Sequence, residues 1–243
     1  MSATATDITL SAQIQLRHRL DLIAHNIANG GTSGFQERLA LPTEEVVSPV
    51  NGQKYSFVSD GSTMRNLALG AFKRTDDPLH VYLNGPGYFS VQTSNGTAYT
   101  RSGIFTRSDS GQVVTAQGYP VLDSNNSAII IPDDVQNVAV GKDGTISDGD
   151  TVLGQIGVFT FANDQLMEEI SDTLFQTDQA PTSVPDAQVI QNGYEGSNMN
   201  PIMGMTQMMN VINAYKQTQQ WIEGYMKLNS TGIQNLVKIP PAA

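Results

Sequence analysis

Residues 198–237 read NMNPIMGMTQMMNVINAYKQTQQWIEGYMKLNSTGIQNLV, and this stretch decides the fold that the sequence predicts. Positions taken alternately three and four apart, from Met205 to Leu236, are apolar with two polar exceptions. A seven-residue repeat of this length is typical of a long helix that packs along another helix. Asn200 is a good N-cap, and the proline after it suits the first helical position. The pattern therefore predicts a helix of about 36 residues, or roughly 54 Å.

A second segment with the same spacing lies near the N-terminus. Its apolar residues are Leu16, Leu20, Ile23 and Ile27. The segment starts near Asp7 and ends before Gly30, which suits a helix C-cap. Pairing with one short helix buries too little apolar surface to offset the conformational entropy that is lost when the long helix becomes ordered. We therefore expect the two terminal helices to pair into a coiled-coil-like stalk and to pack against neighbouring subunits on assembly, although each alone could be an ordinary amphipathic core helix.

The predicted assembly interface includes both helices and the turn that follows the first one. In that turn, Asn29 and Thr32 can bond local backbone groups, Gly34 permits an unusual backbone conformation, and Phe35 can act as an anchor. The interface residues are Leu16, Leu20, Ile23, Ile27, Asn29, Thr32, Gly34, Phe35, Met208, Ile212, Tyr215, Ile222, Met226 and Ile233.

The middle of the chain has a β pattern. Short runs rich in β-branched and aromatic residues occupy 79–83, 88–93, 97–102, 112–116, 128–132 and 154–162. Turn dipeptides separate them, and Asn95-Gly96 between two such runs is a strong hairpin signal. We therefore expect an α+β protein whose centre is an antiparallel β barrel or sandwich.

The sequence divides into four parts on this interpretation. Residues 1–35 form the N-terminal helix of a discontinuous helical domain, and residues 36–66 form a connector. Residues 67–187 form the β domain, and residues 188–243 hold the return segment and the long helix.

Composition excludes several classes of protein. The 243 residues contain no cysteine, so disulfides and thiolate metal sites are absent, and the net charge is −10. Residues 108–195 hold 14 acidic side chains and one basic one, which argues against nucleic-acid binding. No run of 18 apolar residues could insert into a membrane, and the N-terminus does not have the pattern of a signal peptide.

Catalytic and metal-binding patterns are weak. The three histidines, His18, His25 and His80, lack further ligands at metal spacing, so we expect neither a metal nor a cofactor. No phosphate loop or Gly-x-Ser-x-Gly elbow occurs. Acidic residues at turns leave a carbohydrate-acting enzyme or a calcium site as a rival interpretation: Asp133, Asp134, Asp148 and Asp150. A monomeric binding module with a helical stalk is a third interpretation of the sequence.

Several motifs resemble one family, and they occur in that family's order. LDLIAHNIANGGTSGF (20–35) resembles the N-terminal motif of the flagellar axial proteins, which form the rod and hook. DPLHVYLNGPGYFSVQ (77–92), YTRSGIF (99–105), QVVTAQGYPVL (112–122) and GYEGSNMN (193–200) extend the likeness over nearly the whole chain. The short connector and the absence of a large insertion resemble the proximal rod type, with distal rod and hook types as alternatives.

The resemblance implies a non-enzymatic structural subunit of the flagellar basal-body rod, the periplasmic drive shaft that carries torque to the hook. It implies export by the flagellar apparatus without a cleaved signal peptide. The implied partners are proximal and distal rod subunits, copies of the same chain and the export apparatus, with no nucleic acid and no insertion into the membrane.

Overall fold

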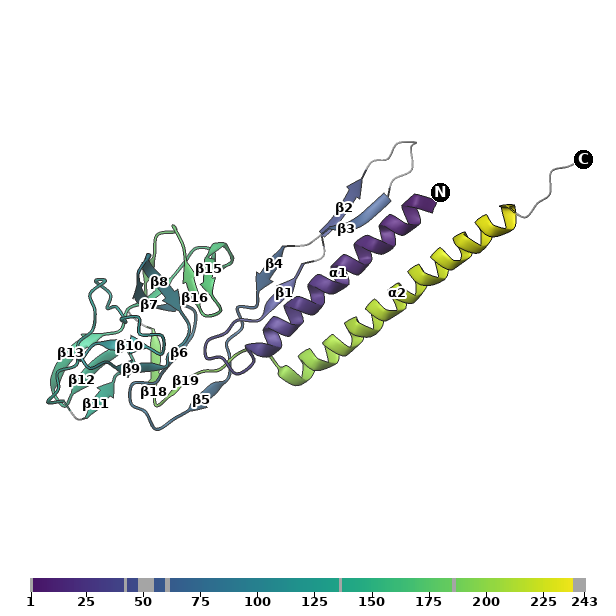
Figure 1. Ribbon diagram of the computed structural model, residues 1–243. Helices are drawn as coiled ribbons and strands as arrows, with labels where there is room; N and C mark the ends of the chain where they lie inside the picture. Colours follow the sequence, from purple (N-terminus) through teal and green to yellow (C-terminus); the bar gives the residue numbers. More distant parts are fainter. Residues whose placement is uncertain are drawn as a thin grey trace, which may run out of the picture. The chain divides into compact units, whose positions relative to one another are not determined.

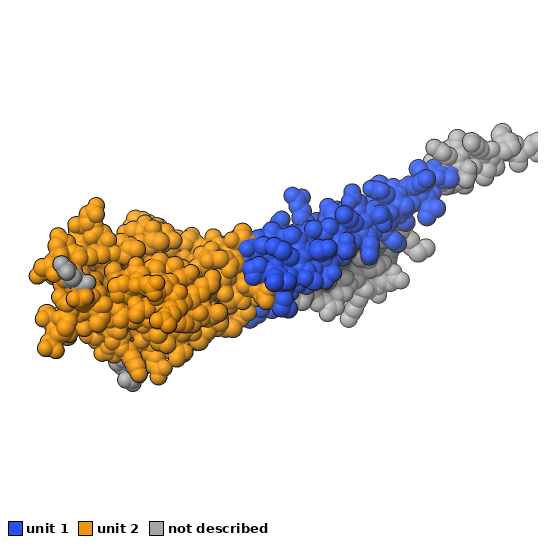
Figure 2. Space-filling model, turned by 90° about the horizontal axis from the view of Figure 1, so that it is seen from below, with its two compact units in different colours: residues 1–27, 38–64, 201–243 blue, residues 28–37, 65–200 orange. Residues whose placement is uncertain are grey.

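The computed structural model describes residues 2–41, 43–47, 55–59, 62–135, 137–184 and 187–237, and shows an α+β protein with two long helices and several antiparallel sheets (Figure 1). The chain forms two compact units, coloured blue and orange in Figure 2. Unit 1 contains residues 1–27, 38–64 and 201–243, and unit 2 contains residues 28–37 and 65–200.

Unit 1 carries the two helices. Helix α2, Pro201–Val237, begins at the proline that the sequence predicts as its first residue. Helix α1, Ser2–Ala28, ends where expected but begins before Asp7, because the alanines in the first turns favour the helix more than Asp7 favours a cap. The coiled-coil pairing of the two helices is not shown and stays a prediction.

Short strands follow α1 in the chain. They are β1 (Arg38–Ala40), β2 (Thr43–Val47), β3 (Tyr55–Ser59) and β4 (Thr63–Arg65). Strand β1 pairs with β4, and β2 pairs antiparallel with β3. The buried amide side chain of Asn26 brackets Arg38, because its Nδ2 donates to the Arg38 carbonyl at 2.7 Å and its Oδ1 accepts from the Arg38 N–H at 3.0 Å. These two bonds fix the start of β1 against the last turn of α1.

The main sheet of unit 2 is open and antiparallel. Its strands, in spatial order, are β15 (Glu168–Ser171), β16 (Leu174–Gln176), β8 (Gly96–Thr100), β7 (Tyr88–Thr93), β14 (Val158–Thr160) and β17 (Thr182–Ser183). Strands β7 and β8 form the hairpin that Asn95-Gly96 predicts, with Thr93 opposite Gly96. The two outermost strands, β15 and β17, do not pair with each other, so the sheet does not close. The predicted barrel is therefore wrong for the residues described.

Smaller sheets complete unit 2. The meander contains β11 (Val138–Val140), β12 (Thr145–Asp148) and β13 (Thr151–Gln155). The two-stranded pairs are β6 (Val81–Asn84) with β18 (Gln188–Gln191), β5 (Phe72–Arg74) with β19 (Gly193–Glu195), and β9 (Phe105–Arg107) with β10 (Val113–Thr115). A single 3-10 turn, η1, spans Asp164–Leu166 in the part of the chain that is described.

Two of the predicted strands differ in the structure. Residues 128–132 make only isolated bridges, although Ile129 and Ile131 are buried in the core. The run 154–162 is divided between β13 and β14, because Gly157 lies against the backbone of residues 122–123, where its N–H donates to Leu122. Burial therefore follows the apolar pattern even where strand pairing does not.

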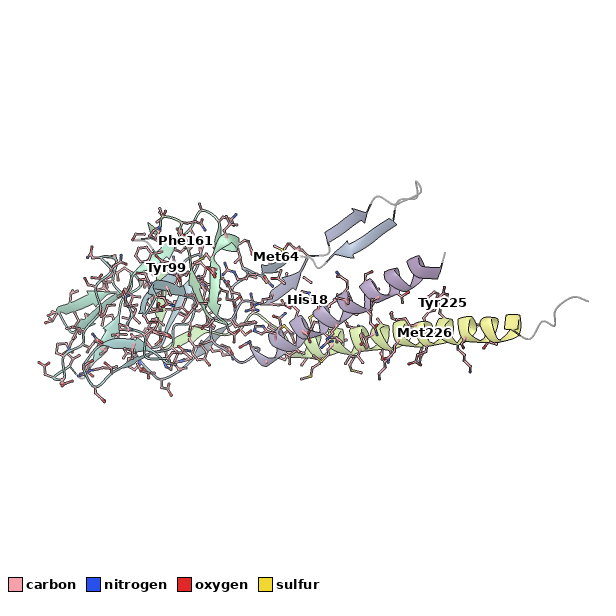
Figure 3. All side chains as sticks on the ribbon, turned by 45° about the horizontal axis from the view of Figure 1, so that its top comes forward. His18, Met64, Tyr99, Phe161, Tyr225 and Met226 are labelled. Carbon is pink, nitrogen blue, oxygen red and sulfur yellow. The ribbon has the colours of Figure 1, made fainter. Side chains whose placement is uncertain are left out.

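The core of unit 2 has two clusters. The larger one is mainly aliphatic but includes Phe89 and Phe105, whose rings pack edge to face with their centres 5.3 Å apart. The smaller one is aromatic, and in it the rings of Tyr99 and Phe161 lie 4.6 Å apart (Figure 3). Such edge-to-face pairs add specific geometry to the burial of apolar surface.

Candidate functional site

Three segments of unit 2 come together. Residues 29–37 follow α1, residues 65–70 begin at the last residue of β4, and residues 193–200 precede α2. We call this set the junction. The Glu195 carbonyl accepts from the Gly34 N–H at 2.8 Å, and its carboxylate Oε1 accepts from the Gly70 N–H at 2.8 Å. One residue of the third segment therefore bonds to both of the others.

An ion pair lies at the centre of the junction. The Arg101 Nε lies 2.9 Å and its Nη2 2.8 Å from Oε2 of Glu195, and the side chains are 3% and 4% exposed. Burial raises the pKa of Glu195, whereas the Arg101 guanidinium and the Gly70 N–H act to lower it. A charge this deeply buried depends on its partner and its hydrogen bonds.

Gly34 allows the close approach of the first segment. Its φ of +69° lies in the left-handed region, as the sequence predicts for an unusual backbone position. A Cβ on Gly34 would lie 2.3 Å from the Ser102 N, next to the Arg101 of the ion pair. Ser33 and Ser102 also share a hydroxyl hydrogen bond of 2.6 Å, and Phe35 is fully buried. The turn after α1 is therefore anchored on the end of β8.

Asn198 bonds to both of the other segments. Its Oδ1 accepts from the Glu37 N–H at 2.7 Å, and its Nδ2 donates to the carbonyls of Asn66 and Ala68 at 2.7 and 2.8 Å. The Asn66 N–H in turn donates to the Glu37 carbonyl at 2.7 Å. The side-chain amide thus completes a three-segment network just before α2 begins.

Arg65 anchors the second segment. Its guanidinium carbon lies 4.1 Å from the centre of the Phe175 ring, and its Nη1 donates to Oε1 of Gln36 at 2.9 Å. Its Nη2 also donates to the Asp164 carbonyl, and its backbone bonds twice to the Gln165 side-chain amide. A buried cation over an aromatic ring is favourable, and hydrogen bonds from the charged group add to this.

The predicted interface residues on α1 and in the turn lie in different environments. Ile23 is buried, and Leu16, Leu20 and Ile27 are half-buried. In the turn, the Thr32 hydroxyl donates to Oδ1 of Asn29 at 3.0 Å. The structure places Asn29, Thr32, Gly34 and Phe35 in the junction.

On α2, most of the buried and half-buried residues form a stripe that has the predicted seven-residue period. Every second residue of this stripe differs from the residue predicted for the interface. Met208, Tyr215 and Ile222 belong to both, whereas Met226 is 59% exposed. Ile212 is half-buried beside the stripe, and Ile233 lies beyond the residues whose side chains are described. The covered stripe is Pro201, Gly204, Met208, Val211, Tyr215, Thr218, Ile222 and Tyr225.

The rest of α2 leaves large apolar side chains in solvent. They include Ile202, Met203, Met205, Met209, Trp221, Met226 and Leu228. Trp221 and Tyr225 stack with their planes 2° apart and their ring centres 5.9 Å apart (Tyr225 and Met226 are labelled in Figure 3). With Gly224 and Leu228 they line a hollow of about 540 Å³ on this helix. An exposed apolar surface of this extent is typical of a protein contact.

The chain is similar in sequence to known proteins of one family. A family model described as the flagellar hook protein FlgE/F/G D1 domain matches residues 82–148. A flagellar basal-body rod protein FlgF from Caulobacter vibrioides is 35% identical over 244 residues, which cover 96% of this chain and 97% of that protein. The chain belongs to the flagellar basal-body rod protein family.

Further rod proteins show similar agreement. A FlgF from Mesorhizobium japonicum is 31% identical and covers 87% of this chain and 88% of its own length. A FlgG from Bacillus subtilis is 33% identical over 69% of this chain and 70% of its own length. The rod-family resemblance that the sequence motifs suggest is therefore confirmed.

Sequence reasoning missed the polar residues that hold the junction of this rod protein together. Arg65, Arg101, Glu195 and Asn198 carry most of its side-chain bonds, and none was among the predicted site residues. Arg101 and Glu195 lie within motifs that resemble the family, YTRSGIF and GYEGSNMN, which was the available signal. No local spacing connects them, because they are 94 residues apart.

Other candidate chemistry has little support in the described residues. Of the rival acidic residues, Asp133, Asp134 and Asp150 are exposed and Asp148 is half-buried. Asp133 pairs with Arg107 on the surface. No group of three or more His, Asp or Glu side chains converges on a common point in the part of the chain that is described. Neither helix, over its described residues, is apolar enough for its length to cross a membrane.

Proposed function

We propose that this chain is a structural subunit of the bacterial flagellar basal-body rod that polymerises through its terminal helices. The observation that carries the proposal is the apolar surface of α2, where Trp221 is 58% and Leu228 is 74% exposed. Helices of this length gain most of their stability from tertiary packing, so these faces require a protein partner.

The distribution of charge supports the same arrangement. Residues 196–243 have a net charge of +2, whereas residues 108–195 have a net charge of −13. Nearly neutral helices can pack beside identical helices without strong repulsion, and the acidic β region is better placed at the solvent-exposed outside of a filament.

The partners in this proposal are other rod subunits and copies of the chain itself. The FlgF-named relatives favour a proximal position in the rod, with a distal position as the alternative. The subunit acts as a mechanical element in the periplasm, without catalysis, and reaches it through the flagellar export apparatus.

The experiment replaces one apolar residue of the covered stripe. Ile222→Asp introduces a charge into a helix–helix contact, so the variant should be exported but absent from purified basal bodies, and the cells should lose motility. Gln207→Asp is the matched control, because Gln207 is an exposed polar residue of the same helix. Circular dichroism should show that both variants keep the β domain folded.

Two outcomes would count against assembly through the helices. One is normal incorporation of the Ile222→Asp variant. The other is equal loss of incorporation in both variants, since a general intolerance of charge on α2 would not identify a helix–helix contact.

A further inference from the structure

The Arg101–Glu195 pair connects segments of unit 2 that lie far apart in the sequence. Arg101 follows β8, and its Nη1 donates to the carbonyls of Gly85 and Gly87, while its Nη2 lies 3.3 Å from the Leu83 carbonyl. With the two contacts to Glu195, all five N–H groups of the guanidinium can be matched to oxygen atoms. Each N–H group of the Arg101 guanidinium therefore has an oxygen partner within unit 2.

Glu195 extends this network to the segments next to the helices. Its carboxylate holds Gly70, and its carbonyl holds Gly34. The tight packing at these points leaves no room for adjustment, because a Cβ on Gly70 would lie 1.8 Å from the Gly196 carbonyl oxygen. The loop between β6 and β7, the end of β8 and all three junction segments are thus joined through two charged side chains.

We propose that Arg101 and Glu195 form a charge clamp that holds the turn after α1 and the segment before α2 in a single conformation on the β domain. Arg101 is a positioning residue in this account, since it acts on both segments through Glu195. The clamp operates within one chain and does not depend on the proposal that the helices polymerise.

An alternative explanation is that Arg101 only fills space. The two explanations differ in what happens to Glu195 when the guanidinium is removed. A clamp leaves a buried carboxylate without its counter-charge, which is costly unless the group takes up a proton. A space-filling role leaves no such dependence on protonation.

The test uses the full-length chain with Arg101→Met, Glu195→Gln and the double variant. Arg107→Met is the matched control, because Arg107 pairs with Asp133 at the surface with side-chain exposures of 26% and 89%. Hydrogen–deuterium exchange at pH 7 compares junction residues 29–37, 65–70 and 193–200 with core strands β7 and β10. For Arg101→Met we expect exchange at the junction to rise by about 10²- to 10³-fold, with a smaller rise in the core strands.

The pH profile provides the second measurement. Burial already raises the folded-state pKa of Glu195, and removal of the Arg101 charge should raise it further. The folded variant therefore holds a proton that it loses, with stability, as the pH rises. The Arg101→Met variant should therefore become less stable to urea between pH 4 and pH 8, relative to the wild type. The double variant should lose that dependence and recover most of the stability, while Arg101→Lys should fall between Arg101→Met and the wild type.

Neighbouring titratable groups do not confuse this profile. Lys73 packs beside Gly196 and is present in every variant. The ring of Tyr88 lies 6.0 Å from the Arg101 guanidinium, and burial raises the pKa of Tyr88. His80, which faces Tyr194 on β19, is likewise present in the wild type and in the Arg107→Met control.

Three results would overturn the clamp. They are a pH-independent loss of stability in Arg101→Met, a loss no greater than that of Arg107→Met, and exchange that rises equally in the junction and in the core strands.

Discussion

At Gly34, one backbone position determines how the turn after α1 meets the β domain. The sequence predicts its unusual conformation, because an isolated glycine between Ser33 and Phe35 follows a helix end. The partner, the backbone at Ser102, could not be predicted, because nothing local identifies it. The same limit applies to Glu195, whose role appears only when Arg101 and Gly70 are brought to it by the fold.

Gly34→Ala should destabilise unit 2 through both strain and a steric clash. The left-handed conformation costs a non-glycine residue about 1–2 kcal/mol, and the clash with Ser102 adds to that cost. Gly118→Ala is the control, because Gly118 has φ +86° but open space around its Cβ. Urea unfolding followed by circular dichroism should show a larger loss for Gly34→Ala, and equal losses would contradict the close approach.

Asn198→Asp should be more harmful at neutral pH than Asn198→Ala. The aspartate keeps an acceptor for Glu37, but it places a carboxylate against the carbonyls of Asn66 and Ala68, where the amide donates. These hydrogen bonds are partly buried or exposed, so each lost bond costs about 0.5–1.5 kcal/mol, and the charge adds to that cost. Part of the stability should return as the pH falls and the carboxyl group is protonated. Urea titrations at several pH values test this, and an Asp variant as stable as wild type at pH 7 would refute it.

At the scale of elements, local signals succeeded where one short segment determines the outcome. The β7–β8 hairpin and the start of α2 follow from Asn95-Gly96 and from Asn200-Pro201. The barrel prediction failed because closure depends on long-range pairing, which strand patterns alone do not specify. On α2, the sequence predicts the seven-residue period of the covered stripe. Apolar residues also lie on neighbouring faces, so the sequence alone does not determine which residues belong to the stripe.

Val211→Ala and Met226→Ala distinguish the covered stripe of the structure, which includes Val211, from the stripe predicted from the sequence, which includes Met226. Val211 is buried, so truncation should cost the monomer about 1–2 kcal/mol of local stability, at about 0.8 kcal/mol per methylene group. Met226 is exposed, so its truncation should leave the monomer unchanged. Hydrogen exchange of α2 amides measures both effects. A larger effect of Met226→Ala in the monomer would favour the phase predicted from the sequence.

At the scale of the whole molecule, the chain combines a well-packed β domain with two long helices whose apolar faces are incompletely covered. The larger core cluster, which includes Val91, Phe105 and Ile131, lies wholly in unit 2. The junction secures the segments next to both helices without requiring the helices to be stable alone. This separation suits a subunit whose β domain folds first and whose helices gain their remaining contacts on assembly.

The most direct test is hydrogen–deuterium exchange over residues 212–225 of α2, in dilute monomer and in isolated rods. We predict that exchange is at least about 100-fold faster in the monomer than in the rod, because neighbouring subunits supply the contacts that the single chain lacks. Equal, strong protection of α2 in the dilute monomer would contradict assembly-dependent packing of the terminal helices.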